Sequence, residues 1–301
     1  MYILTTTSSF SINEFPDGLN VIHNPYKRKL TGDEIKDLII KYQPVGIIAG
    51  VEPLTREVMM AAENLKVISR CGIGIDSVDM KAAGELGIKV TITPEAPMIS
   101  VAELTIGLIL SIIRKITVLD AGIRKGGWKG PKGNLLWGKT VGIIGCGRIG
   151  TYVSRLLKAF GCDVIGYDPY IKEHEICRMV GFEELLEKSD IISLHIPYTD
   201  ENKNIIGAAQ LKQMKPTCLL INAARGGLID EDALYEALKN GEIAGAALDC
   251  FAEEPYSGPL TKLENTVLIP HMGSSATEAR IMMEKQALDN LIKGLEEFGI
   301  I

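Results

Sequence analysis

The sequence has no pair of cysteines spaced as CxxC, and its six cysteines are scattered along 301 residues. This spacing argues against a zinc site and against a disulfide framework, so we expect no bound metal and a reducing, cytoplasmic location. Basic residues are in the minority, and the net charge of −6 does not favour a nucleic-acid or membrane surface as partner. The longest strongly apolar run, 104–113, is too short to span a bilayer, and we expect no signal peptide.

Histidine is also scarce, with four in the chain. His23 and His174 have polar, charged neighbours in the sequence, which indicates surface positions. His195 ends a strand-like run, where a structural role or a contact at the edge of a cofactor is favoured over acid–base work. His271 follows another strand-like run. Because ligands bind at the carboxyl ends of strands in open α/β sheets, His271 is a candidate proton donor if partners lie nearby.

Strand-like apolar runs alternate with stretches of helical spacing along most of the chain. The runs are residues 3–5, 46–50, 67–69, 90–92, 141–144, 164–167, 191–195, 218–222, 246–249 and 267–269. Thr31 and Glu34 have the spacing of a capping box before a helix. Alternating strands and helices predict βαβ units and parallel sheets.

The alternation falls into two parts. Residues 1–97 hold one set of βα units, and 100–116 has the composition of a long apolar helix that leads out of it. A second set begins near Thr140. A last helical stretch at the C-terminus has no strand after it, so its pattern allows it to cover either part.

The segment TVGIIGCGRIG contains the glycine spacing of a dinucleotide-binding turn, Gly145-x-Gly147-x-x-Gly150. Gly145 permits a tight turn, Gly147 lets the backbone approach a pyrophosphate, and Gly150 lets the following helix pack closely on the strand. By themselves, such glycines also occur in ordinary turns. The next strand, however, ends at Asp168, where an acid can accept both ribose hydroxyls of NAD and repel the 2′-phosphate of NADP. Together these features predict NAD as the cofactor.

A second glycine-containing turn, RCGIGIDSVD, begins at Arg70. It does not match the fingerprint, because Ser77 stands in the third glycine's place. One interpretation is a tight turn between a strand and a helix capped by Asp79. The other is a backbone cradle that, with Arg70, holds a small anionic substrate. The pattern alone does not choose between them.

Reduction of a keto acid by hydride needs a cation for the carboxylate and a proton donor of near-neutral pKa. Arg225 follows the run 218–222 and is flanked by glycines that let a ligand approach, although it could equally be a surface cation. Glu253 and Glu254 follow the run 246–249. Either carboxylate would fix the tautomer of a neighbouring histidine, and the alternative for both is a charged turn.

Eight segments occur in an order that is characteristic of one family: SRCGIGIDSVD, SVAELTIGLIL, LWGKTVGIIGCGRIG, YDP, HIPYT, INAARGGLIDEDAL, GAALDCFAEEP and IPHMGSS. The chain resembles the D-2-hydroxyacid dehydrogenases over nearly its whole length, and is most similar to the short phosphoglycerate dehydrogenases that lack a C-terminal regulatory domain. The resemblance implies a catalytic triad of Arg225, Glu254 (the glutamate directly before Pro255) and His271.

The resemblance also implies two Rossmann- or flavodoxin-like domains with parallel sheets. An NAD domain, 98–276, is inserted in a discontinuous substrate domain, 1–97 plus 277–301, and we expect a homodimer through the NAD domain, including the segment around Trp128. The expected substrate cradle is Arg70, Cys71, Gly72, Ile73 and Gly74. The expected cofactor contacts are Gly145, Gly147, Arg148, Ile149, Gly150, Asp168, His195, Pro197, Ala223, Ala224, Asp249 (near the nicotinamide amide), Gly273 and Ser274.

Two positions depart from the phosphoglycerate dehydrogenase pattern. Ala49-Gly50 stands where that type has Arg-Ser, which removes a candidate phosphate-binding arginine, and Pro97 stands where the family usually has asparagine. The expected activity is therefore NAD-dependent interconversion of a D-2-hydroxy acid and its 2-keto acid. The substrate is 3-phosphoglycerate with 3-phosphohydroxypyruvate, or a different 2-keto acid such as glyoxylate, hydroxypyruvate or a pathway-specific one.

Other classes of protein are alternatives. An NAD(H)-sensing binding protein on the same fold is one, and the presence of all three of Arg225, Glu254 and His271 argues against it. A methyltransferase is another, and it would not need these three residues together. A reductase with a Tyr-Lys pair would need YxxxK after Gly150. Tyr235 and Lys239 have that spacing, so the spacing alone does not exclude this class.

Overall fold

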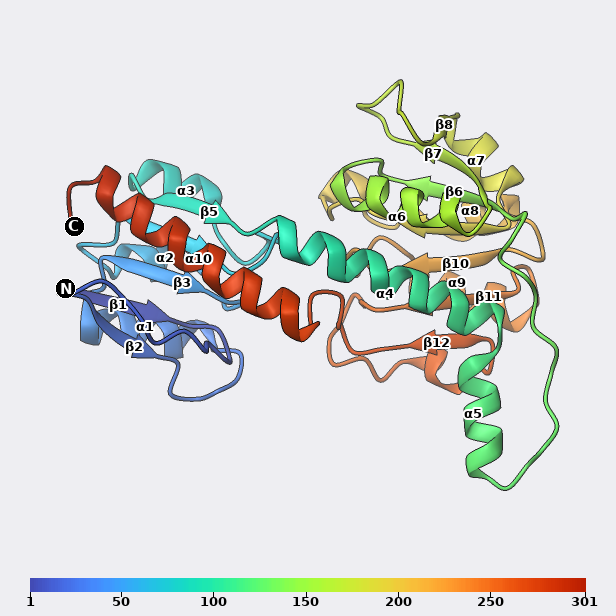
Figure 1. The fold of residues 1–301 in the computed structure, drawn as a ribbon, viewed down its shortest axis with the longest axis horizontal. Helices are drawn as coiled ribbons and strands as arrows, with labels where there is room; N and C mark the ends of the chain where they lie inside the picture. Colours follow the sequence, from blue (N-terminus) through green and yellow to red (C-terminus); the bar gives the residue numbers. More distant parts are fainter. The chain divides into compact units, whose positions relative to one another are not determined.

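All ten strand-like runs predicted from the sequence are β-strands in the computed structural model, which describes residues 1–301. The strands form two parallel sheets, one in each of two units (Figure 1). Unit 1 comprises Met1–Pro97 and Ser274–Ile301, and unit 2 comprises Met98–Gly273. The predicted fold class, two α/β domains with parallel sheets, is confirmed. The sequence-based boundary lies after residue 276, and the observed one lies after Gly273.

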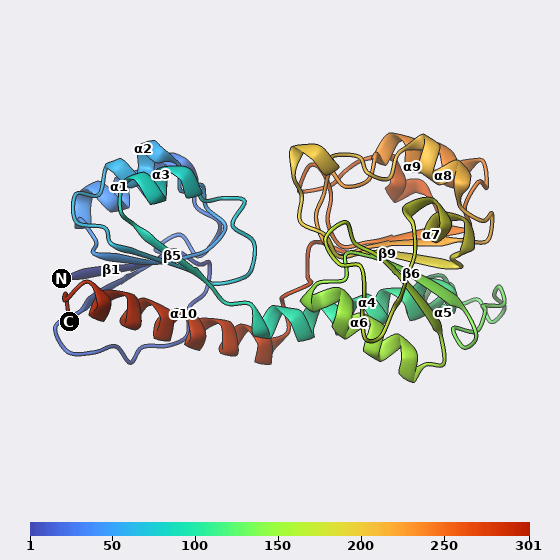
Figure 2. The ribbon, with the colours of Figure 1, turned by 90° about the horizontal axis from the view of Figure 1, so that it is seen from above.

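Unit 1 has five strands: β1 (Tyr2–Thr5), β2 (Asn20–His23), β3 (Gly46–Ala49), β4 (Val67–Arg70) and β5 (Lys89–Ile92). Their order in the sheet is β2-β1-β3-β4-β5. The helices α1 (Gly32–Tyr42), α2 (Arg56–Met60) and α3 (Met80–Glu85) cover one face, and α10 (Thr277–Glu297) covers the other (Figure 2). The last helical stretch, which the pattern did not assign, therefore belongs to unit 1.

Helices on both faces explain the apolar runs of the central strands of unit 1. All four residues of β3 and of β4 are buried, so neither strand alternates between apolar and polar residues. The edge strand β2 is only half-buried, and this is why its short run, NVIH, was not predicted. The predicted capping box is confirmed: the Thr31 hydroxyl accepts from the Glu34 N–H, and the Glu34 carboxylate accepts from the Thr31 N–H.

The order in which the chain adds strands to the sheet of unit 1 reverses between β1 and β3, and we call this point the change of direction. The chain leaves β1 to form β2 on one side and returns to form β3 on the other. The loops that follow the carboxyl ends of β1 and β3 therefore diverge, and this is where ligands bind in sheets of this order. Thr6 and Gly50 directly follow these two strands, and Arg70 ends the neighbouring β4.

Unit 2 has seven strands: β6 (Thr140–Ile144), β7 (Asp163–Tyr167), β8 (Arg178–Met179), β9 (Ile191–Leu194), β10 (Leu219–Asn222), β11 (Gly245–Leu248) and β12 (Thr266–Leu268). Their order is β12-β11-β10-β9-β6-β7-β8, with the change of direction between β6 and β9. The helices α4 (Glu95–Ile113) and α6 (Arg148–Ala159) pack on one face (Figure 2). The helices α7 (Phe182–Lys188), α8 (Ala208–Gln213) and α9 (Glu231–Lys239) pack on the other. Two 3-10 turns, η1 (Asp200–Asn202) and η2 (Pro259–Lys262), lie in the loops.

Helix α4 is longer than the apolar run in the sequence and begins earlier than the predicted 100–116. It ends at Ile113 because Lys115 adopts a left-handed backbone conformation (φ 59°), after which α5 (Ile116–Arg124) starts. By length and composition α4 is able to cross a membrane, which the apolar run 104–113 did not indicate. Within the fold, 61% of that stretch is buried, as in the core helix of a protein that spans no membrane. Its apolar character follows from packing against the sheet of unit 2.

Candidate active site

The glycine fingerprint follows β6 at the point where the sheet of unit 2 changes direction. Gly145 has a φ of +95°, and a Cβ there would lie 2.6 Å from the carbonyl oxygen of His195. At Gly150 a Cβ would lie 2.0 Å from the carbonyl oxygen of Gly145. The fold itself therefore requires these two glycines, one for the turn and one for the close packing of α6 on the strand.

Gly147 is different, because nothing in the protein requires it to be glycine. Its φ is −71°, and no heavy atom lies within 4 Å of where its Cβ would be. It is the N-cap of α6, and no side chain caps that helix. Beside it lies a hollow of about 640 Å³ that is also lined by Cys146, Arg148 and Thr151. An uncapped helix N-terminus and an open glycine in a hollow fit the pyrophosphate of a dinucleotide.

Asp168 directly follows β7 beside the glycine turn. The Cys146 N–H donates to its Oδ2 (3.0 Å), and the Tyr170 N–H donates to its Oδ1 (2.9 Å). These two bonds hold the carboxylate at the end of the strand, next to the residue that separates Gly145 from Gly147. This is the position at which an acid accepts the ribose hydroxyls of NAD.

We expect Asp168→Ser to change which dinucleotide the protein prefers. The substitution removes the acceptor for the ribose hydroxyls and the negative charge that repels a 2′-phosphate, so the preference for NADH over NADPH should fall at least about tenfold. The measurement is the ratio of the two dissociation constants by fluorescence titration. Asp163→Ser, at the exposed start of the same strand, is the matched control and should leave the ratio unchanged. An unchanged ratio in Asp168→Ser would contradict the assignment.

His271 and Glu254 meet at the carboxyl edge of the same sheet. Nδ1 of His271 lies 2.9 Å from Oε2 and 3.0 Å from Oε1 of Glu254. The Phe251 N–H also donates to Oε1, which fixes the carboxylate. Of the two glutamates that the pattern left open, Glu254 is the one that contacts the histidine. Because the carboxylate accepts from Nδ1, the other ring nitrogen, Nε2, is left for a ligand.

The loop that carries His271 is held by Asp249, one residue beyond β11. The His271 N–H donates to the Asp249 carbonyl, and both carboxylate oxygens of Asp249 accept N–H groups, from Met272 and Gly273. Burial raises the pKa of the Asp249 carboxyl group, whereas these N–H donors lower it. His271 itself has a φ of +55°, a conformation that a non-glycine residue rarely adopts unless its surroundings impose it.

Arg225 lies in the loop after β10, next to the loop that carries Glu254. Its Nη1 donates to the Ala224 carbonyl (2.7 Å), and Asn222 holds the loop from both sides, accepting from the Ala224 N–H and donating to the Arg225 carbonyl. A Cβ at Gly226 would lie 1.8 Å from the carbonyl oxygen of Phe251, so the two loops touch through their backbones. The candidate triad thus comes from loops after three adjacent strands, β10, β11 and β12.

The other histidines of unit 2 have structural surroundings. His195 is half-buried; desolvation lowers its pKa to about 4, and Ser193 Oγ lies 2.9 Å from its Nε2. The ring is therefore neutral near pH 7 and unsuited to proton donation. His174 was predicted to lie on the surface but is half-buried: its Nε2 contacts Thr151 Oγ1, and its Nδ1 accepts from two backbone N–H groups. The charged neighbours in the sequence gave no sign of these bonds.

The turn at 70–74 lies at the carboxyl end of β4 in unit 1. Asp79 caps α3, accepting from the Ala82 N–H, so the first interpretation of this motif describes its structure. Gly72 has a φ of +138°, and a Cβ there would lie 2.7 Å from Nη1 of Arg70. The Arg70 side chain is thus folded under the turn and donates to the Cys71 carbonyl. The turn can still serve as a cradle, but through its backbone rather than through an extended arginine.

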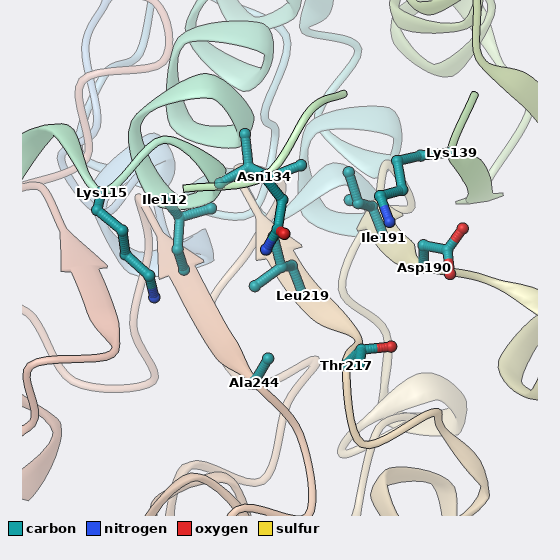
Figure 3. A pocket seen from close by; sticks show the side chains of 10 residues that line it. Ile112, Lys115, Asn134, Lys139, Asp190, Ile191, Thr217, Leu219 and Ala244 are labelled. Carbon is teal, nitrogen blue, oxygen red and sulfur yellow. The ribbon is translucent and has the colours of Figure 1, made fainter. Parts of the chain in front are cut away.

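A second hollow, of about 150 Å³, lies at the opposite edge of the sheet of unit 2 (Figure 3). Its lining residues Lys139, Asp190 and Thr217 come just before β6, β9 and β10, at the amino ends of the strands. The Asp190 carboxylate accepts from the Thr140 N–H and from Lys215. This hollow therefore lies away from the glycine fingerprint and the triad.

Unit 2 has a dinucleotide-binding turn where the strand order of its parallel sheet reverses. At the same edge of the sheet lies a histidine that is held by a carboxylate. These features define a dinucleotide-binding α/β protein. The family model for the D-isomer specific 2-hydroxyacid dehydrogenase, NAD binding domain, matches residues 106–273. The chain belongs to this family, and unit 2 carries its NAD-binding domain.

Relatives with known names support this family assignment. The chain is 47% identical to the D-3-phosphoglycerate dehydrogenase of Methanocaldococcus jannaschii over 260 residues, which are 83% of this chain and 49% of that protein. It is 37% identical to the glyoxylate reductase of Korarchaeum cryptofilum over 303 residues, with 94% and 91% covered. The crystal structure of the TT0316 protein from Thermus thermophilus superposes with a TM-score of 0.90 at 35% identity, covering 99% of this chain and 97% of that one. The chain thus spans about half the length of the phosphoglycerate dehydrogenase it matches.

Proposed function

We propose that the chain is an NAD-dependent oxidoreductase that interconverts a D-2-hydroxy acid and its 2-keto acid. One observation carries the proposal: the His271 ring is held at Nδ1 by Glu254, 2.9 Å away, at the same sheet edge as the dinucleotide turn. A proton donor and a hydride carrier at one edge are what reduction of a carbonyl group requires.

The proposed roles follow from the geometry. Bound NADH supplies the hydride for the keto carbon. His271 holds at Nε2 the proton that the carbonyl oxygen gains, and Glu254 stabilises the charged ring through Nδ1. Arg225 binds the carboxylate of the acid and orients it, because a guanidinium can donate two parallel hydrogen bonds to a carboxylate. In the oxidation direction the neutral His271 accepts the proton.

The proposed cofactor contacts are those expected from the sequence. Gly147, Arg148 and the N-terminus of α6 would hold the pyrophosphate, and Asp168 the adenosine ribose. The backbone of residues 70–74 in unit 1 would hold the acid.

Exposed aromatic rings support a homodimer through the segment around Trp128, because Trp128 is 91% and Trp137 73% exposed. A reducing compartment is proposed because all six cysteines are free thiols.

The test is oxidation of NADH with a panel of 2-keto acids: glyoxylate, pyruvate, hydroxypyruvate, 3-phosphohydroxypyruvate and a branched-chain acid. We expect turnover of at least one acid, and formation of the D-enantiomer on chiral analysis of the product. NADH binding without turnover of any acid would contradict the proposal and favour the NAD(H)-sensing alternative.

A further inference from the structure

A buried glutamate lies beside the point at which the strand order in the sheet of unit 1 reverses. Glu52 lies three residues beyond the end of β3 and is 1% exposed. The Thr6 hydroxyl, just beyond β1, donates to its Oε1, and the Gly50 N–H donates to the same oxygen (3.1 Å). The carboxylate therefore bridges the two diverging loops in which a sheet of this order binds its ligand.

The surrounding backbone is built around this carboxylate. A Cβ at Gly50 would lie 2.7 Å from Oε2 of Glu52 and 3.1 Å from Cα of Thr7. Any side chain at position 50 would have to displace the glutamate. Gly50 departs from the phosphoglycerate dehydrogenase pattern. A glycine is required there because Glu52 fills the space of a side chain, and not because a turn needs glycine.

The strand that leads to Glu52 pairs with the strand that leads to the proposed cradle. Ala49 on β3 pairs with Arg70 on β4, and the Cys71 N–H donates to the Ala49 carbonyl. Burial raises the pKa of Glu52, while its hydrogen bonds and the charge of Arg70 lower it. The guanidinium of Arg70 lies beneath Gly72. The net effect is a raised pKa for Glu52, and Arg70 is the cation whose charge acts on this carboxyl group.

We infer that Glu52 makes unit 1 select 2-hydroxy and 2-keto acids whose remaining side chain carries no phosphate or other anionic group. The inference rests on the proposed function and names the class of its substrate. A phosphate beside the cradle would be repelled by the ionised form of the Glu52 carboxyl group, which water does not screen. A neutral side chain, such as a hydrogen, a methyl or a hydroxymethyl group, meets no such repulsion.

The relatives of the chain include both kinds of enzyme, a phosphoglycerate dehydrogenase and a glyoxylate reductase by name. Sequence identity alone therefore does not decide whether the acid is phosphorylated. Glu52 places this chain with enzymes for unphosphorylated acids, although the chain is 47% identical to a phosphoglycerate dehydrogenase.

The experiment compares two acids that differ only in a phosphate group, hydroxypyruvate and 3-phosphohydroxypyruvate. We expect the wild type to prefer hydroxypyruvate in kcat/KM by at least about 100-fold, since like charges brought together cost several kcal/mol and each 1.4 kcal/mol is tenfold. Glu52→Gln keeps the shape but removes the charge, and should reduce this preference at least about tenfold. Glu63→Gln, an exposed glutamate of the same unit, is the control and should leave it unchanged.

A merely structural role for Glu52 would lower both activities together and leave their ratio unchanged, which would overturn the inference. Equal use of the two acids by the wild type would overturn it as well. A binding measurement separates this from failure of the proposed function: D-glycerate and 3-phospho-D-glycerate are titrated into the NADH complex by calorimetry, without turnover. The inference holds if only Glu52→Gln gains affinity for the phosphorylated acid, and it fails if wild type and variant bind the two acids in the same ratio.

Discussion

Replacement of His271 by asparagine is expected to lower kcat by about 10²- to 10⁴-fold, the usual contribution of a positioned general acid. Asparagine can still place an amide N–H toward Glu254, so the loop keeps its support, but it has no group that gives or takes a proton near pH 7. The dissociation constant for NADH should change by less than about threefold, because the ring acts on the carbonyl oxygen and not on the dinucleotide. Single-turnover kinetics, together with an NADH titration, measure the two quantities separately.

His23→Asn is the matched control for loss of a histidine. His23 ends β2 at the edge of the sheet of unit 1, where its Nδ1 lies 2.8 Å from Thr5 Oγ1. We expect this variant to keep the wild-type kcat. Near-normal turnover in His271→Asn would rule out His271 as the proton donor. A parallel loss of NADH binding would instead indicate that the loop held by Asp249 had collapsed.

The sequence predicted strands where both sheet faces are covered by helices. Such strands have unbroken apolar runs, as β3 and the first three residues of β10 do, and these runs stand out from their surroundings. It did not predict β2 and β8, because an edge strand with few buried residues, such as RM at 178–179, has no such run. The boundaries of α4 were shifted because its end depends on the left-handed conformation of Lys115, which the residue type does not predict.

The candidate site was predictable to the level of residue type but not of geometry. The spacing of the glycines and Asp168 indicates a dinucleotide turn. The pattern alone left Glu253 and Glu254 open, because the choice depends on side-chain direction, and only the resemblance to the family selected Glu254. The part of Asp249 in holding the His271 loop was not foreseen either. An acid directly after a buried strand is the only signal of this role that the sequence offered.

Glu52 was missed for a related reason. It stands in IIAGVEP, where a glutamate after an apolar strand suggests an exposed loop. Only the structure shows that the loop turns back and buries the carboxylate against Thr6 and Gly50. The sequence did carry a trace of this arrangement, because Gly50 departs from the related pattern at a position where a Cβ would meet Glu52.

Two alanine substitutions within the glycine fingerprint should affect different properties, stability at Gly150 and NADH binding at Gly147. Gly150→Ala places a Cβ 2.0 Å from the Gly145 carbonyl oxygen, a backbone atom that cannot move aside without displacing α6 or the turn. We expect a loss of at least about 3 kcal/mol in the free energy of unfolding, at or above the upper end for overpacking. The measurement is urea unfolding of the NAD-free protein.

Gly147→Ala should leave stability within about 1 kcal/mol of the wild type, because the Cβ meets no protein atom and the backbone conformation is allowed for alanine. It should nevertheless weaken NADH binding at least about tenfold, since the methyl group would fill the space that the pyrophosphate needs. Gly181→Ala is a close control: Gly181 is the N-cap of α7, has a φ of −67°, and has no atom within 4 Å of its Cβ position. Unchanged NADH affinity in Gly147→Ala would mean that the dinucleotide does not approach the backbone there. If affinity falls at 147 but not at 181, the glycine is required by the ligand and not by the fold.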